Sequence, residues 1–170
     1  MSWENRLAAL FGLDDSGWER HANPWSGWSR LFTGLPLIVL AIWSRAWIGW
    51  WSILPILLTI IWLWINPLLF PPPGDDRAWM SRGVFGERLW SRRKELALPE
   101  GSTIWPIVAN AVTGLFTLAL IYGLVVLDVT ATLLGAVGTA AAKLAFMHLM
   151  ARLYVKAKSR DPSLAYRASA

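Results

Sequence analysis

Four long apolar stretches dominate the chain, and short polar or charged segments separate them. They cover residues 29–47, 48–65, 103–127 and 129–154. A helix needs roughly 20 residues to cross the hydrocarbon of a bilayer, and each stretch comes close to that length or exceeds it. The pattern predicts an all-α fold: a polytopic membrane protein with four transmembrane helices, the first two kinked at Pro36 and Pro55.

Two minimal corners divide these stretches into two hairpins. Arg45 to Gly49 interrupts the first pair, and Asp128 alone interrupts the second. A single helix over residues 31–65 would be roughly 50 Å long at about 1.5 Å per residue, well beyond the thickness of a bilayer. We therefore expect a tight turn at each corner.

The whole chain, residues 1–170, is expected to form a single membrane domain. An N-terminal segment over 1–28 contains a short amphipathic helix at 2–13, whose apolar side chains recur on one face. The first hairpin covers 29–66 and the second covers 103–154, and a polar tail follows over 155–170.

The connecting loop over residues 67–102 is basic and contains a run of three prolines at residues 71–73, which cannot continue a helix. Apolar and basic residues alternate in its second half. We expect one or two short interfacial helices there, broken near Gly83 and Gly86.

The distribution of basic residues predicts the orientation. Lys and Arg gather in the N-terminal flank, the connecting loop and the C-terminal flank, whereas the two corners hold only Arg45 and Asp128. Cytoplasmic segments carry the excess of Lys and Arg, and four crossings place all three basic segments on one side. The chain is thus expected in the inner or plasma membrane with both termini in the cytoplasm.

Composition supports the membrane class and indicates which kind of partner the chain binds. Apolar residues make up 55% of the chain, charged residues only 16%, and there are 13 Trp, many of them at the ends of apolar stretches. Trp settles where hydrocarbon meets water. The net charge of +5 comes from residues that flank these stretches, which favours anionic lipid head groups over nucleic acid as partners. With no Cys, disulfides and thiolate chemistry are excluded.

Lys143 is the residue whose position most needs an explanation. A charge inside a span requires a partner or a wet cavity, unless its flexible stem lets it reach the head groups. Small and polar residues on the third and fourth stretches, including Asn110, Gly114, Thr117 and Thr139, are expected to face each other. Lys143 would then lie near Asn110 or a loop carboxylate. Together with Asp128, these residues could form a ligand or ion path, although a lone Asp between two spans favours a turn.

A second group of polar residues falls at the expected cytoplasmic interface. Its members are His21, Asn23, Arg30, Arg82, Glu87 and Arg88. Ion pairs of Glu87 and Arg88 with Arg20, Arg30 or Asp76 could join the loop to the N-terminal segment, and this structural role is favoured over catalysis. His21 and His148 are the only histidines, and their spacing favours structural roles over a haem or metal site; no metal site or cofactor is assigned.

Three motifs carry a resemblance to a known family. HANPWSGWSR at residues 21–30, Asn66-Pro67, and RGVFGER at residues 82–88 resemble a family of small, Trp-rich prokaryotic integral membrane proteins classified only as a domain of unknown function. The resemblance covers roughly residues 18–155. It implies a compact helical membrane domain and supplies no activity.

Three functional hypotheses remain open. The leading one is a non-catalytic membrane protein, either an accessory subunit of a larger complex or a binder of an apolar or planar ligand. The first alternative is a small transporter or channel-like oligomer that uses Lys143 and Asn110. The second is a membrane enzyme with an interfacial site built from His21, Asn23, Glu87 and Arg88.

Overall fold

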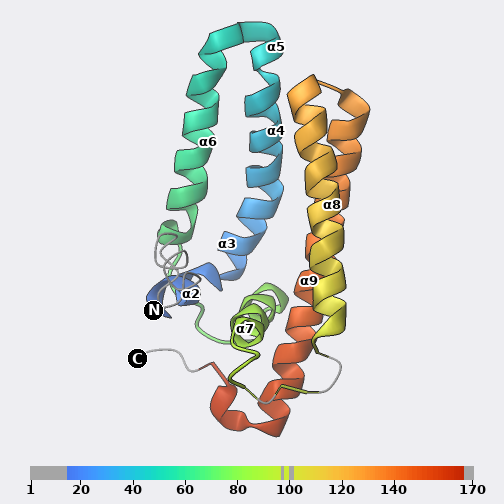
Figure 1. Ribbon diagram of the computed structural model, residues 1–170. Helices are drawn as coiled ribbons and strands as arrows, with labels where there is room; N and C mark the ends of the chain where they lie inside the picture. The colour runs from blue at the N-terminus through green and yellow to red at the C-terminus, as the bar shows by residue number, and fades with distance from the viewer. Residues whose placement is uncertain (1–14, 97, 100–101, 167–170) are drawn as a thin grey trace.

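The computed structural model describes residues 15–96, 98–99 and 102–166 and shows an all-α chain of two helical arms with a short helix across their foot (Figure 1). The expected amphipathic helix at 2–13 lies outside the described residues. The rising and descending parts of each arm lie side by side, and both arms begin and end at the foot (Figure 1).

The first arm begins with the short helix α2 (Asp15–His21) at the foot and then rises as an almost continuous helical rod (Figure 1). The rod comprises α3 (Pro24–Ser29), the π-helix η1 (Arg30–Gly34) and α4 (Leu35–Trp43). Asn23 caps α3 by accepting a hydrogen bond from the backbone N–H of Trp25 at 2.9 Å. Pro36 lacks the N–H that would bond the carbonyl of Phe32, which accounts for the wider π turn at the expected kink.

The first arm then reverses and descends. Helix α5 (Arg45–Ile48) leads to Gly49, whose φ of 53° favours glycine, and the chain returns through η2 (Gly49–Ser52), α6 (Ile53–Ile65) and η3 (Asn66–Leu69). Arg45 joins this corner to the other arm, because its Nη2 donates to the carbonyls of Leu124, at 2.6 Å, and Val125.

The second arm is a long hairpin of α8 (Ile104–Val126) and α9 (Val129–Arg160). Leu127 ends α8 in the left-handed conformation. Asp128 caps α9 by accepting a hydrogen bond from the backbone N–H of Ala131 at 2.6 Å, so this side chain stabilises the turn between α8 and α9. Helix α9 continues beyond the expected end at Tyr154 and ends at Arg160, since apolar and small residues such as Leu153 and Ala157 stay buried on one face.

Helices α8 and α9 approach closely where small residues meet. A Cβ at Gly135 would collide with the backbone of Leu120, and the hydroxyls of Thr117 and Thr139 lie 3.4 Å apart. These contacts agree with the expected facing stripes. Gly114 was expected in the same interface, but a Cβ there would meet nothing within 4 Å, because Gly114 faces away from α9.

Helix α7 (Trp79–Ser91) packs across the lower part of α9 (Figure 1). The expected breaks near Gly83 and Gly86 are wrong, since α7 runs unbroken through both residues. A Cβ at Gly86 would collide with the backbone carbonyl of Met150, so the missing side chain allows close packing of two helices. Phe85, Phe146, Met150 and Tyr154 form the buried core at this crossing.

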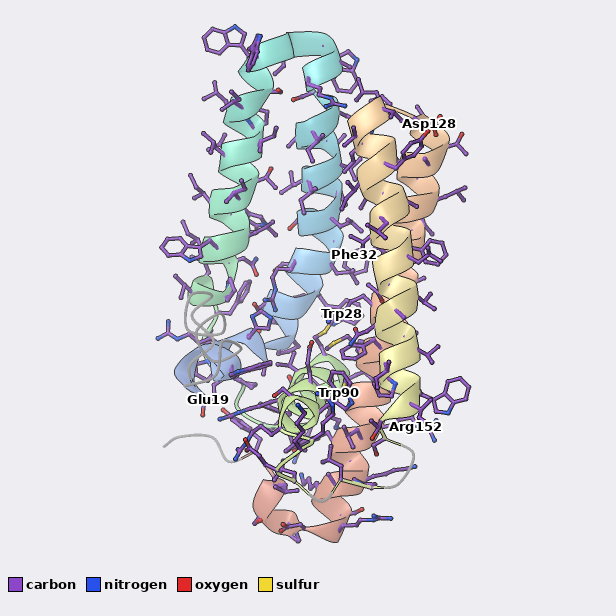
Figure 2. All side chains as sticks on the ribbon, in the orientation of Figure 1. Glu19, Trp28, Phe32, Trp90, Asp128 and Arg152 are labelled. Carbon is purple, nitrogen blue, oxygen red and sulfur yellow. The ribbon has the colours of Figure 1, made fainter. Side chains whose placement is uncertain are left out.

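An aromatic stack connects the first arm to α7. Trp28 stacks on Phe32 and on Trp79, with ring centroids 5.6 and 5.7 Å apart. Figure 2 shows Trp28 and Phe32 at the lower end of the rising helix, on the side that faces the second arm. The foot is thereby the part of the molecule where the two arms and α7 pack together.

Among the described residues, three helical stretches are long and apolar enough to cross a membrane: Pro24–Leu69, which contains the reversal at Gly49, then Ile104–Val126 and Val129–Arg160. Above the foot, Leu, Ile and Val side chains of these stretches are largely exposed. Exposed Trp side chains lie at the ends of the arms, namely Trp47, Trp50 and Trp51 at the corner and Trp25, Trp64 and Trp105 toward the foot.

Candidate functional site

A cavity of about 380 Å³ lies at the foot, bounded by α2, α3 and η1 of the first arm, by α7 and by α9. Four of its lining residues are polar: His21, Arg30, Glu87 and Lys143. The apolar lining residues include Trp18, Leu31, Met80, Val84, Leu144 and Met147. A lining that combines both kinds of side chain suits a ligand with one polar and one apolar end.

Arg30 is held in place by the helix before it. Its Nε donates to the carbonyl of Ser26 at 3.0 Å, and its Nη2 donates to the carbonyl of His21 at 3.3 Å. Its Nη1 lies 2.6 Å from Nδ1 and 2.7 Å from Nε2 of His21. A guanidinium N–H can donate only to an unprotonated ring nitrogen, so this contact requires a neutral imidazole.

The electrostatics of the cavity keep His21 neutral. Burial, as the larger cause, and the positive charges of Arg30 and Lys143 together lower the pKa of His21 from its usual 6.5 to about 3. With His21 neutral, the lining carries two positive charges, from Arg30 and Lys143, and one negative charge, from Glu87. The excess positive charge favours an anionic group in the cavity.

Lys143 pairs with Glu87 across the boundary between α9 and α7. Its Nζ donates to Glu87 Oε1 at 3.2 Å and lies 4.6 Å from the centroid of the Phe146 ring. Two partners were expected for Lys143, namely Asn110 or a loop carboxylate. The structure shows the loop carboxylate, which is that of Glu87. Glu87 was expected to pair with residues of the N-terminal segment. It forms an ion pair with Lys143 of α9, because α7 lies across that helix.

Three of the expected interfacial residues lie outside the lining of this cavity. The Nδ2 of Asn23 donates to the carbonyl of Pro71 at 2.9 Å, and Arg82 Nε donates to the carbonyl of Asp76 at 2.8 Å. Arg88 borders a separate hollow beside Tyr154 and Tyr166. Asn23 and Arg82 therefore anchor backbone segments, and the residue set of the enzymatic alternative does not gather in one cavity.

The expected ligand or ion path is likewise divided. Asn110 is exposed on α8 and makes no side-chain hydrogen bond within the described part of the chain. Asp128 caps α9 at the end of the molecule opposite the cavity (Figure 2). Lys143 alone of these three residues lines the cavity. His21 and His148 border different hollows.

Within residues 15–96, 98–99 and 102–166, no three His, Asp or Glu side chains converge as a metal site. The arrangement at the foot can hold a polar or anionic group beside an apolar surface. Within it, Lys143 is engaged by Glu87 and His21 by Arg30.

The sequence did not predict a polar network that the structure shows at the foot. Asp76 Oδ2 accepts hydrogen bonds from Lys158 and, at 2.8 Å, from the hydroxyl of Tyr154, which in turn accepts from the N–H of Tyr166. Partial burial opposes ionisation of Asp76, but Lys158, Tyr154 and Arg82 outweigh it and lower the pKa of its carboxyl. No local motif signals this network, because bonded residues such as Asp76 and Lys158 lie 82 residues apart.

The apolar lining also combines distant residues. Trp18, Met80 and Met147 come from three helices, and each looks like an ordinary core or interfacial residue in its own segment. Only the crossing of α7 over α9 and the packing of the first arm on both bring them to one cavity.

The fold and its exposed apolar faces place this protein in the class of small, multi-pass helical membrane proteins. Within that class, the chain belongs to the family of unknown function DUF6653, whose model matches residues 2–170. No curated protein and no solved structure matches the chain.

Proposed function

We propose that this protein is a non-catalytic membrane protein that binds an amphiphilic anion in the cavity at its foot. The observation that carries the proposal is the composition of the lining of that cavity: Arg30 and Lys143 with only Glu87 to balance their charge, together with apolar residues such as Leu31, Leu144 and Met147. An anionic head group would contact the cations, and an apolar chain would contact the apolar lining residues.

The membrane setting supports this proposal. In the proposed topology the chain crosses the bilayer four times, twice in each arm, and both termini face the cytoplasm. The cavity then lies at the cytoplasmic surface, where an amphiphile can enter from the lipid with its head group in contact with water. The exposed Trp at both ends of the arms fit the two interfaces of such a bilayer.

The test uses two probes that share a chain and differ in the head group. Oleate and oleyl alcohol are titrated onto the purified protein in a neutral detergent, and bound mass is followed by native mass spectrometry. The expected result is that oleate binds roughly tenfold more tightly than the alcohol, since charge-assisted hydrogen bonds are stronger than neutral ones.

Two variants separate the cavity from the rest of the surface. Leu31→Trp should fill part of the cavity and weaken oleate binding, whereas Leu118→Trp, on an exposed face of α8, should leave it unchanged. Equal binding of oleate and oleyl alcohol, or equal loss in both variants, would refute the proposed site.

Asn110 favours a second candidate, assembly into an oligomer through the outer face of α8. Lipid chains cannot satisfy the exposed amide of Asn110, and the open space beside Gly114 would let another helix approach closely. If α8 forms this contact, Asn110→Leu should shift the protein to a smaller particle in light-scattering measurements in detergent. An unchanged particle mass would count against the oligomer.

A further inference from the structure

Two hollows flank the same pair of basic residues near the lower end of α9. The first, about 280 Å³, lies between α9 and the start of α8 and is bordered by Trp105, Pro106, Leu149 and Leu153. The second, about 300 Å³, lies between α9 and α7 and is bordered by Trp79, Arg82 and His148. Arg152 and Lys156 belong to the lining of both hollows.

The charge in these hollows is uncompensated. No carboxylate lines either one, and Arg152 and Lys156 make no ion pair within the described residues. Their neighbours on α9 behave differently, since Lys143 pairs with Glu87 and Lys158 pairs with Asp76. Arg152 and Lys156 are exposed and follow each other by one helical turn, so both can contact one ligand.

The surroundings place this pair at the edge of the hydrocarbon. Figure 2 shows Arg152 beside the lower end of α8, far from the corner at Asp128. Trp79 and Trp105 border the two hollows, and Trp favours the level of the lipid head groups. Leu149 and Leu153 contribute apolar side chains to the lining of the first hollow.

The start of α8 adds to the attraction for an anion. Helix α8 begins at Ile104, has no acidic residue in its first turn, and receives no side-chain hydrogen bond from its cap residue Thr103. The positive end of the helix dipole therefore lies beside the first hollow. This contribution acts in the same direction as the two cations.

We propose that the hollows on the two sides of Arg152 and Lys156 bind the head group of a phospholipid with two phosphates, one phosphate in each hollow. A single phosphate would occupy only one of the hollows and leave the other cationic. The acyl chains would lie along Leu149 and the exposed apolar face of α8. This site is separate from the cavity of Arg30 and Lys143, and neither proposal depends on the other.

The experiment compares three lipids on the delipidated full chain in a neutral detergent. Diphosphatidylglycerol, phosphatidylglycerol and phosphatidylcholine are titrated, and the first bound lipid is quantified by native mass spectrometry. The expected order of affinity is that in which they are named, with diphosphatidylglycerol roughly 30-fold tighter than phosphatidylcholine if each of the two cations contributes as basic residues do at anionic membranes.

The variants test the location. Arg152→Gln with Lys156→Gln should bring the affinity for diphosphatidylglycerol down to that for phosphatidylcholine. Arg77→Gln with Arg160→Gln removes the same charge from exposed positions outside both hollows and should leave the preference intact. The thermal midpoint of each variant is measured alongside to confirm that it is folded.

Three outcomes would overturn the proposal. The unmodified chain could bind all three lipids equally, which needs no variant to establish. Phosphatidylglycerol could bind as tightly as diphosphatidylglycerol, which would remove the argument for two phosphates. The control pair of substitutions could reduce binding as much as the test pair, which would reduce the effect to overall surface charge.

Discussion

A Cβ atom at Gly86 would collide with the backbone carbonyl of Met150, whereas one at Gly114 would meet no other group within 4 Å. Both glycines lie inside helices, so the two sites differ in packing and not in backbone conformation. At the scale of single residues, this contrast shows how α7 comes to lie against α9.

We therefore predict opposite effects for two identical substitutions. Gly86→Ala should destabilise the protein by about 1–3 kcal/mol, because the two helices must separate. Gly114→Ala should be neutral or stabilise the protein by up to about 1 kcal/mol, because Ala favours the helix. Thermal unfolding in one detergent measures both, and a Gly86→Ala variant as stable as the unmodified chain would show that α7 does not pack this way.

The pKa of His21 gives a prediction about pH. The group has a pKa of about 3 in the folded state and about 6.5 when unfolded, so the unfolded chain binds more protons between these values. The contribution of neutral His21 to stability is complete above about pH 6.5 and is lost progressively as the pH falls toward 3.

The thermal midpoint should consequently fall more steeply on acidification in the unmodified chain than in His21→Gln, which keeps an acceptor for Arg30 and does not titrate. His148→Gln is the matched control, because His148 is exposed and does not line the cavity of Arg30. Identical pH profiles for the unmodified chain and His21→Gln would contradict the burial of His21 against Arg30.

At the scale of secondary-structure elements, Arg45 connects the two arms at the end opposite the foot. Its guanidinium reaches the last carbonyls of α8, which lack partners within their own helix and carry the negative end of the helix dipole. The contact combines hydrogen bonds with a favourable charge.

Arg45→Met should keep the length of this side chain but lose these bonds, and we expect a loss of about 1–3 kcal/mol in unfolding free energy. Arg77→Met serves as the control, since 88% of the Arg77 side chain is exposed and its contact with Asp75 is a surface ion pair. If the two variants unfold at the same temperature, Arg45 does not hold the arms together.

The helices themselves follow largely from local sequence. The turns at Gly49 and Asp128 are local signals. Both were recognised because the two apolar stretches that each turn separates are together too long for one bilayer crossing. The path of α7 was not recognised, because Gly83 and Gly86 weaken a helix in isolation. Their cost is offset only by packing against Met147 and Met150, which lie far along the chain.

At the scale of the whole molecule, the candidate site is where prediction from sequence reached its limit. Lys143 and Glu87 were each singled out, but their contact depends on α7 crossing α9. Asn23 and Arg82 were grouped with them on position alone, and the structure gives these two residues backbone carbonyls as partners. Charge and hydropathy place residues at a membrane surface, whereas their pairing requires the helix packing.

We propose that both arms cross the membrane as hairpins and that the foot, with its cavity and basic residues, faces the cytoplasm. The chain has no Cys, so single cysteines can be introduced without removing others. Trp50→Cys marks the corner, where the native side chain is 88% exposed, and Arg77→Cys and Ser159→Cys mark the foot.

Labelling with a membrane-impermeant maleimide in intact cells and in inverted vesicles tests this claim most directly. We predict that Trp50→Cys reacts only in intact cells, while Arg77→Cys and Ser159→Cys react only in inverted vesicles. Reaction of all three cysteines from the same side, or of Arg77→Cys and Ser159→Cys from opposite sides, would contradict the account.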